Sequence, residues 1–394
     1  MFLSLFIIFS LGILGGVIFE KIKLPKLVWY IILGILIGPS VLNIVDESLL
    51  NISSYLRQIA LIIILTRSGL SLDINNLKKI GRLAILMCFL PACFEIIGIL
   101  IFGPLLLDIS YLEALLLGSV LAAVSPAIIV PRMIKLMNEG YGKEHNVTEL
   151  VLAGASCDDI FVIVLFYSFK GLVANNVFDA WNILQIPVSI VAGILLGLII
   201  GLLMSLIIKK LKFNTVVNVI LLLGLSFGMV ALEEILKPYF SISALLGIIV
   251  VGLILLLTNK EEAKQIQKSY NSLWNGFEIL LFVLVGVATN IHYALSSDGL
   301  IILGLIIIGL VFRVLGVIVC LIATKFDIKE KIFIVLSYLP KATVQASIGA
   351  IALTEGLPCG EIVLTAAVIS ILFTAPVGAI LIDNTYKKLL IKYN

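Results

Sequence analysis

Two neighbouring carboxylates in an apolar stretch are the residues with the clearest potential for chemistry. Asp158 and Asp159 lie near the centre of residues 150–167, LVLAGASCDDIFVIVLFY, a stretch long enough to cross a bilayer. An ionised carboxylate buried in hydrocarbon is costly, and two are more so. Because a chain keeps such a pair where water, an ion or protons can reach it, the doublet predicts a transport or proton-relay site. The alternative is an acid that a buried basic partner neutralises for fold stability alone.

The residue types around the doublet suit a small alkali cation. Sodium or lithium needs hard oxygen ligands in place of its water, and carboxylates, hydroxyls and freed backbone carbonyls provide them. We expect these ligands, in decreasing order of importance, from Asp159, Asp158, Ser156, Ser125 and Thr343. Protons compete for the same two carboxylates, which titrate as a coupled pair. A bound cation and a bound proton therefore exclude each other, and no resident cofactor is expected.

The composition is that of a membrane protein. Of the 394 residues, 61% are hydrophobic and 13% are charged, and the mean hydropathy is +1.22. Soluble domains have roughly 25% charged residues. The chain is therefore predicted to be an all-α polytopic membrane protein. Its net charge of +3 is too small to indicate nucleic acid, and its five cysteines form no CxxC pair, so no disulfide framework or metal cluster is expected.

Thirteen apolar segments are predicted to be transmembrane helices. They cover residues 2–20, 27–45, 54–72, 80–107, 110–137, 147–173, 183–209, 214–232, 239–258, 272–292, 297–324, 330–354 and 358–386. The loops after the odd-numbered segments hold most of the 27 lysines and arginines, whereas the other loops are mainly acidic. By the positive-inside rule, the N-terminus is predicted outside and the C-terminus in the cytoplasm, for a multi-pass protein of the cytoplasmic (inner) membrane.

Several charged residues fall inside these segments at a similar depth. Glu95, Asp158, Arg313 and Lys341 share a level near the middle of the membrane, at a helical rise of about 1.5 Å per residue. Glu95 and Arg313 are predicted to form an ion pair, which we interpret as structural. Removal of one partner from such a pair costs about 3–5 kcal/mol. Arg67 either binds the end of a half-helix or extends its charge toward the interface.

Prolines predict a helix break in two segments. The fifth segment reads SVLAAVSPAIIVPRM, with Ser125 and Pro126 at mid-depth, and the twelfth reads SYLPKATVQASIGAIA, in which Lys341 and Gln345 follow Pro340. Proline removes a backbone donor and clashes with the preceding turn. Because polar residues accompany both prolines, we expect unwound helices that present carbonyls and half-helix ends to an ion.

The order of these features predicts an internal symmetry. The fifth and twelfth segments are seven apart, and so are the fourth and eleventh, which carry Glu95 and Arg313. Because seven is odd, corresponding segments cross the membrane in opposite directions. The chain is therefore predicted to contain two six-helix inverted repeats joined by the seventh segment, an arrangement typical of alternating-access transporters.

These motifs resemble those of a known family. The segment GASCDDIFVIVLF resembles the two-aspartate signature of the monovalent cation/proton antiporters, and LAAVSPAIIVP and YLPKATVQASIG resemble the two crossing, broken helices of that fold. The combination is most similar to the NHA branch of sodium/proton exchangers and covers nearly the whole chain. The resemblance implies a homodimer whose protomers each have a dimerisation domain, residues 1–72 and 214–292, and a mobile core, residues 80–173 and 297–386. Residues 183–209 would form a linker helix.

The resemblance also implies roles for individual residues. By position, Asp159 matches the ion-binding aspartate and Asp158 its neighbour, and Arg313 lies where electrogenic relatives have a lysine. Glu95 matches the acid that pairs with that arginine, and Lys341 matches the charge near the helix crossing. Because a buried arginine keeps its proton, a cycle in which Arg313 releases one is not available. The implied function is exchange of Na⁺ or Li⁺ for protons across the bilayer.

Other classes of protein fit the sequence less well. Potassium/proton exchange is an alternative that the sequence does not separate from sodium/proton exchange. A sodium-coupled symporter of an organic anion shares the fold, but the aspartate doublet argues against it. An intramembrane aspartyl protease takes its acids from two spans, one in a GxGD motif, and the sequence contains no Gly-Asp dipeptide. A channel does not need two opposed broken helices around titratable acids. The protein is therefore not expected to be an enzyme.

Overall fold

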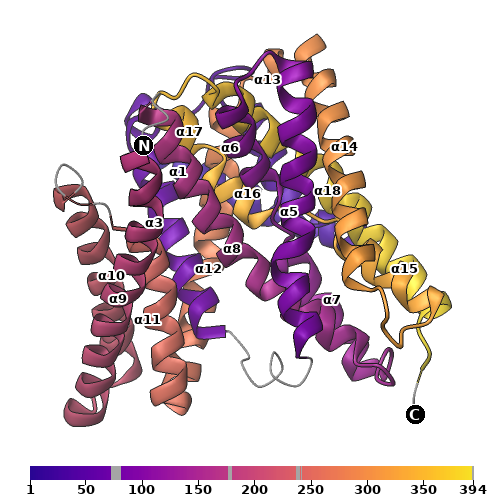
Figure 1. Ribbon diagram of the computed structural model, residues 1–394. Helices are drawn as coiled ribbons and strands as arrows, with labels where there is room; N and C mark the ends of the chain where they lie inside the picture. Colours follow the sequence, from indigo (N-terminus) through magenta and orange to yellow (C-terminus); the bar gives the residue numbers. More distant parts are fainter. Residues whose placement is uncertain (72–80, 176–179, 237–239, 241, 393–394) are drawn as a thin grey trace. The chain divides into compact units, whose positions relative to one another are not determined.

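The computed structural model describes residues 1–71, 81–175, 180–236, 240 and 242–392, without the side chains of 156–157, 174–175 and 180–187. Within these residues the chain is helical, apart from its loops and one isolated antiparallel bridge between Tyr141 and Lys392 (Figure 1). The prediction of an all-α chain is therefore confirmed for the described part.

Eight predicted segments correspond to one continuous helix each. They are α1 (Phe2–Lys21), α3 (Glu47–Ser71), α5 (Arg82–Leu107), α8 (Val147–Asn175), α9 (Ala180–Leu211), α10 (Thr215–Leu236), α14 (Ser297–Cys320) and α18 (Gly360–Leu389).

Three further segments form helices whose ends differ from the prediction. They are α2 (Lys26–Ile37), α11 (Ala244–Thr258) and α12 (Lys260–Ala288). α2 ends early because Gly38 is extended, and the proline that follows it disfavours a helical conformation there. α12 begins at Lys260, well before the predicted 272, because its first half is a polar helix that hydropathy alone does not detect. A salt bridge of 3.3 Å between Lys264 Nζ and Glu261 Oε1 supports that half.

Both predicted breaks are present. The fifth segment is divided into α6 (Tyr111–Leu121) and α7 (Pro126–Glu139), and the twelfth into α15 (Ile328–Ser337), α16 (Thr343–Ile348) and α17 (Ile351–Thr354). A short helix, α13 (Ile291–Ala294), precedes α14. The backbone N–H of Ser125 donates to the carbonyl of Pro340 at 2.8 Å, so the two breaks contact one another. Figure 1 shows α6 and α16 close together among the surrounding helices.

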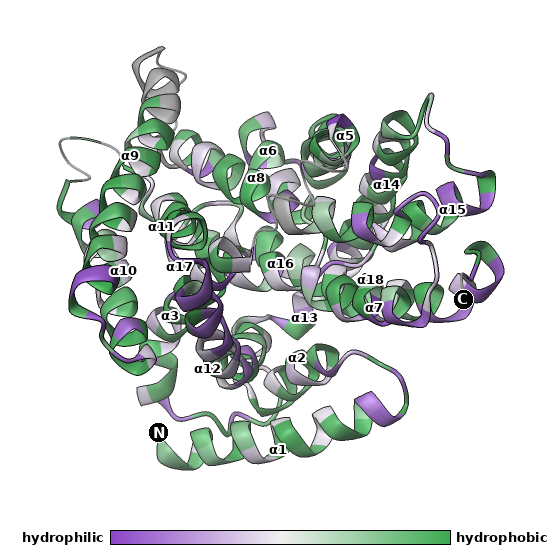
Figure 2. Cartoon of the chain, turned by 90° about the horizontal axis from the view of Figure 1, so that it is seen from below, coloured by the Kyte–Doolittle hydropathy of each residue, from purple (hydrophilic) through white to green (hydrophobic). Residues whose placement is uncertain are grey.

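Ten helical segments in the described part of the chain are long and apolar enough to cross a membrane. Shorter apolar helices occupy the other three predicted segments, at Lys26–Ile37, Ala244–Thr258 and Thr343–Thr354. The number of thirteen spans and the inverted repeats therefore stay predictions. Large apolar side chains are exposed on the outer helices, for example Phe2 (82% exposed) and Phe6 (67%) on α1. Figure 2 shows α1 as hydrophobic along most of its length. Such a surface fits lipid, and the chain is a multi-pass membrane protein.

The chain divides into two compact units. The first comprises residues 1–54, 73–169 and 279–394, and the second comprises 55–72 and 170–278. Their boundaries fall within α3, α8 and α12. Because compact units defined by packing need not coincide with parts that move, the predicted core and dimerisation domains stay a prediction.

The first unit contains both breaks and the aspartate doublet. α5 and α14 run side by side in it (Figure 1). Their contact is close because Gly98 and Gly316 leave no room for a side chain: a Cβ on Gly98 would lie 2.7 Å from Phe312, and one on Gly316 would lie 2.8 Å from Pro91. This packing brings Glu95 of α5 and Arg313 of α14 to the same interface.

Candidate functional site

The aspartate doublet lies inside α8, where the two side chains have different surroundings. Asp158 is fully buried, whereas Asp159 is 7% exposed. Consecutive residues of an α-helix point in directions about 100° apart, so neighbours in sequence face different parts of the protein. One carboxylate oxygen of Asp158 accepts a hydrogen bond from the backbone N–H of Val124 at 2.7 Å. Val124 belongs to the unwound link between α6 and α7, so the doublet is tied directly to the first break.

Arg313 connects four separate parts of the first unit. Its Nη2 lies 3.0 Å from Asp158 Oδ2, and its Nη1 lies 3.1 Å from Glu95 Oε2. Its Nε donates to the carbonyl of Tyr338 at 2.7 Å, and Nη1 also donates to the carbonyl of Ala122. The guanidinium presents its donors in a fixed fork, which suits a site with several acceptors. Arg313 therefore joins α5, α8 and the C-terminal ends of α6 and α15.

Glu95 pairs with two cations. In addition to Arg313, the Nζ of Lys341 lies 2.6 Å from Glu95 Oε1, and both side chains are fully buried. Lys341 Nζ also donates to the carbonyl of Leu121. The sequence predicted only the pair of Glu95 with Arg313. The structure extends it to a network of two acids, Glu95 and Asp158, and two bases, Arg313 and Lys341.

The C-terminal end of α6 is where these cations converge. A helix leaves its last carbonyls without intrahelical partners, and these carry partial negative charge. The carbonyls of Leu121 and Ala122 accept from Lys341 and Arg313 respectively. The amide nitrogen of Gln345, a fully buried residue of α16, donates to the carbonyl of Ala123 at 2.8 Å. The unwound backbone is therefore held by three buried side chains.

Most of the remaining predicted residues lie at or beside the two breaks. Ser125 is fully buried and precedes Pro126, the first residue of α7, where a missing N–H leaves no bond unmade. Pro340 lies between α15 and α16, and its carbonyl accepts from Ser125. Thr343, 3% exposed, is the first residue of α16. Ser156 is on α8, but its side chain is outside the described part of the structure.

Two contributions to the site, and one charged partner outside it, were not found from the sequence. The hydroxyl of Thr374 on α18 accepts a hydrogen bond from the backbone N–H of Lys341 at 2.9 Å. The ring of Tyr338 lies 5.7 Å from the guanidinium carbon of Arg313. Neither is signalled by residue type, because a threonine or tyrosine in an apolar segment is ordinary. In the second unit, Glu278 of α12 interacts electrostatically with Arg67 of α3. Glu278 could have been found from the sequence, because it is an acid within the predicted transmembrane segment 272–292.

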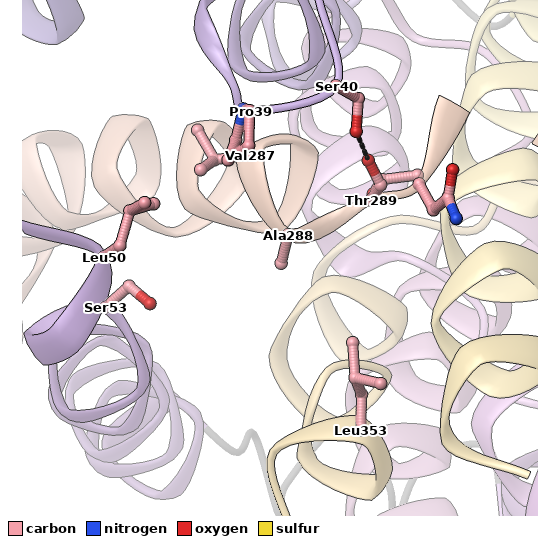
Figure 3. A pocket seen from close by; sticks show the side chains of 9 residues that line it. Pro39, Ser40, Leu50, Ser53, Val287, Ala288, Thr289 and Leu353 are labelled. Atoms are coloured by element: carbon pink, nitrogen blue, oxygen red, sulfur yellow. Dashed lines mark hydrogen bonds between the residues drawn. The ribbon is translucent and has the colours of Figure 1, made fainter. Parts of the chain in front are cut away.

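A separate pocket of about 510 Å³ opens in the first unit. Its lining residues come from the end of α2, the start of α3, the end of α12 and α17, and they are Pro39, Ser40, Leu50, Ser53, Val287, Ala288, Thr289, Asn290 and Leu353. The hydroxyl of Ser40 donates to the carbonyl of Thr289 at 3.3 Å (Figure 3). None of the predicted ion-binding residues whose side chains the structure describes lines this pocket, and neither do the four residues of the charge network.

Comparison with known proteins places the chain in a family. Residues 5–388 match the family model described as "Sodium/hydrogen exchanger, transmembrane". The human protein "Sodium/hydrogen exchanger 9B2" is 32% identical, over 99% of this chain and 75% of its own length. Human "Sodium/hydrogen exchanger 9B1" is 33% identical, over 99% of this chain and 78% of its own length.

The fold also has a solved counterpart. The sodium proton antiporter MjNhaP1 from Methanocaldococcus jannaschii superposes with a TM-score of 0.82, covering 98% of this chain and 97% of that one at 23% identity. The resemblance stated from the aspartate doublet and the two breaks is confirmed. A chain with these motifs in this order, matched along almost all of its length, belongs to the sodium/hydrogen exchanger family.

Proposed function

We propose that the protein is a secondary antiporter that exchanges Na⁺ or Li⁺ for protons by alternating access, with cation and protons competing for Asp159 and Asp158. The observation that carries the proposal is the position of the doublet. Its Asp158 is bound to the break between α6 and α7 and to a buried charge network, in a chain of the exchanger family. In this proposal Ser156, Ser125 and Thr343 complete the oxygen ligands.

The charge balance of the site supports competition. Glu95 and Asp158 balance Arg313 and Lys341 in the ion pairs of the network. Asp159 is the other acid of the doublet, and a carboxylate in a low-dielectric site takes either a proton or a monovalent cation in order to lose its charge. We therefore expect loaded sites of either kind to cross the membrane and empty ones not to, which gives exchange of the cation for protons.

The wider architecture follows the same proposal. The two broken helices would form part of a mobile core, residues 80–173 and 297–386, and residues 1–72 and 214–292 would form the dimerisation domain of a homodimer. The protein would lie in the cytoplasmic membrane with its N-terminus outside and its C-terminus inside. The pairing of Glu95 with Arg313 and Lys341 would keep its structural role, because arginine does not release a proton.

The substitution Asp159→Asn tests the proposal. It removes the ionisable group but keeps the size of the side chain. In everted vesicles, cation-induced proton release should be abolished, whereas Asp298→Asn, an exposed residue at the start of α14, should leave it unchanged. Retained exchange in Asp159→Asn would refute the assignment.

Competition also predicts a pH dependence. Below the pH at which the site is half-protonated, the apparent KM for the cation should rise by about tenfold per pH unit if a single proton competes. The rise should occur without loss of kcat. The same dequenching assay in sodium, lithium and potassium salts identifies the cation, and exchange with potassium alone would favour a potassium/proton antiporter.

A further inference from the structure

One buried polar side chain at the break has a role that the ion pairs do not explain. Gln345 lies on α16 and is fully buried. Its amide nitrogen is within hydrogen-bonding distance of three carbonyl oxygens of the other broken helix, those of Val120 (3.1 Å), Leu121 (3.4 Å) and Ala123 (2.8 Å). A single neutral side chain thus holds the end of α6 and the start of the unwound link.

These carbonyls also determine which way the amide faces. Carbonyl oxygens accept hydrogen bonds and do not donate them, so the NH₂ group of Gln345 must be the end that faces α6. The opposite orientation would place the amide oxygen against three other oxygens. The amide oxygen of Gln345 is therefore directed away from α6 by the geometry of the break itself.

That oxygen is buried without a hydrogen-bond partner among the described residues. A buried acceptor left without a partner is costly and calls for an explanation in each case. In the described part of the chain, the other carboxylate oxygen of Asp158 and the hydroxyl of Ser125 are in the same condition. A cation that has lost its water is one species that such oxygens satisfy.

The three side chains meet one short stretch of backbone. Gln345 bonds the carbonyl of Ala123, Asp158 bonds the N–H of Val124, and Ser125 is the next residue. Consecutive Cα atoms are about 3.8 Å apart, so the contacts fall within a stretch of roughly 8 Å. The side chains that carry these unpartnered oxygens, a carboxylate, a hydroxyl and an amide, thus contact or belong to the same unwound segment.

We infer that Gln345 is a specificity-determining residue of the cation site, whose amide nitrogen fixes the break and whose amide oxygen is a neutral ligand of the transported cation. The inference rests on the proposed cation/proton exchange and adds a ligand to it. A neutral oxygen raises the number of ligands without adding a second charge that would attract another proton. Ligand number is one of the properties by which oxygen sites discriminate between cations. The larger Na⁺ takes more oxygens than Li⁺, so the loss of this ligand affects Na⁺ more.

The test uses two substitutions that separate the oxygen from the rest of the side chain. Gln345→Met keeps the length of the side chain but removes both the oxygen and the donors. Gln345→Glu keeps an oxygen, and its carboxyl can retain a proton to donate to one of the carbonyls of α6. The matched control is Ser347→Ala on the same short helix, because the hydroxyl of Ser347 donates only to the carbonyl of Thr343 in its own turn.

Exchange is measured in proteoliposomes with a pH-sensitive dye, as KM and kcat for Na⁺ and for Li⁺. We expect Gln345→Met to raise the KM for Na⁺ at least about tenfold, equivalent to ~1.4 kcal/mol, to raise the KM for Li⁺ less, and to change kcat little. Gln345→Glu should return the KM for Na⁺ toward the wild-type value, and Ser347→Ala should match wild type.

Three results overturn the inference. The first is an unchanged KM for Na⁺ in a folded Gln345→Met protein. The second is an equal rise in the KM for Na⁺ and the KM for Li⁺ in Gln345→Met that Gln345→Glu does not reverse, and the third is a fall in the kcat of Gln345→Met without a change in KM. If Gln345→Met does not fold, Gln345→Glu decides the question, since a tenfold higher KM for Na⁺ in that variant contradicts the oxygen-ligand role. Wild type and Asp159→Asn are measured alongside. Absence of exchange in the wild type, or retained exchange in Asp159→Asn, would count against the proposed function. Loss of exchange in Asp159→Asn together with an unchanged KM for Na⁺ in Gln345→Met would count against the role of Gln345 alone.

Discussion

The buried charge network makes a specific prediction about compensation between Glu95 and Arg313. Glu95→Gln removes one negative charge from the network and leaves both cations without their shared carboxylate. Arg313→Met removes one positive charge, which leaves Asp158 without its ion-pair partner and Glu95 with Lys341 alone. Each single substitution therefore leaves the four-residue network with an unbalanced charge. Removal of one partner of a buried pair costs about 3–5 kcal/mol.

The double substitution restores the balance. With Glu95→Gln and Arg313→Met together, Lys341 and Asp158 remain, and their charges are opposite. The carbonyls of Tyr338 and Ala122 still lose their donor, at a cost of about 1–3 kcal/mol for each group left buried without a partner. The double variant should therefore be less stable than wild type, but the loss should be smaller than the sum of the two single losses by about 0.5–3 kcal/mol.

The measurement is the thermal unfolding midpoint of the four purified proteins in the same detergent. Proton/cation exchange in proteoliposomes is measured in parallel. We expect the midpoint of the double variant to lie below that of wild type but above the value that the sum of the two single losses gives. Additive losses would show that the two residues do not compensate each other, and the structural interpretation of the ion pair would then be wrong.

Three further predictions concern packing, a peripheral ion pair and a helix cap. Gly34→Ala should strongly lower the unfolding midpoint in detergent, because its Cβ would lie 2.0 Å from a backbone carbonyl oxygen of α12. In the control Gly304→Ala the added Cβ would have no atom within 4 Å, so the midpoint should rise slightly, for a gain in stability of up to about 1 kcal/mol. Arg132→Ala should destabilise more than Asp383→Asn in the same unfolding assay, because Arg132 also bonds a carbonyl of its own helix; each effect should be about 1 kcal/mol or less for this part-exposed pair. Ser110→Ala removes a capping box at the start of α6 and should cost about 1 kcal/mol, measured as a lower unfolding midpoint, with transport retained.

The helices, the two helix breaks and the place of the candidate site could all be predicted from the sequence. Hydropathy identified the helices, since lipid-exposed backbone must satisfy its hydrogen bonds internally and an apolar run of sufficient length is readable without any tertiary information. The prolines at 126 and 340 located both breaks, because a missing N–H acts locally. The doublet of Asp158 and Asp159 located the candidate site, because acids inside an apolar segment are costly to bury and are easily recognised in the sequence.

Three features of the fold were predicted less well from the sequence. The polar first half of α12 was missed, because it is amphipathic rather than apolar. α2 was predicted too long, since an apolar run continues past the turn at Gly38. The acid Glu278 was overlooked because no partner for it is near in sequence.

Only the tertiary structure decided which charges meet. Depth in the membrane grouped Glu95, Arg313 and Lys341, but depth does not specify which face of a helix a side chain occupies. Packing of α5 against α14 placed one carboxylate between two cations, and the contact of the two breaks brought Gln345 to the carbonyls of α6. Partners so far apart along the chain are selected by the geometry of helix packing, which is a property of the whole fold and not of any one segment.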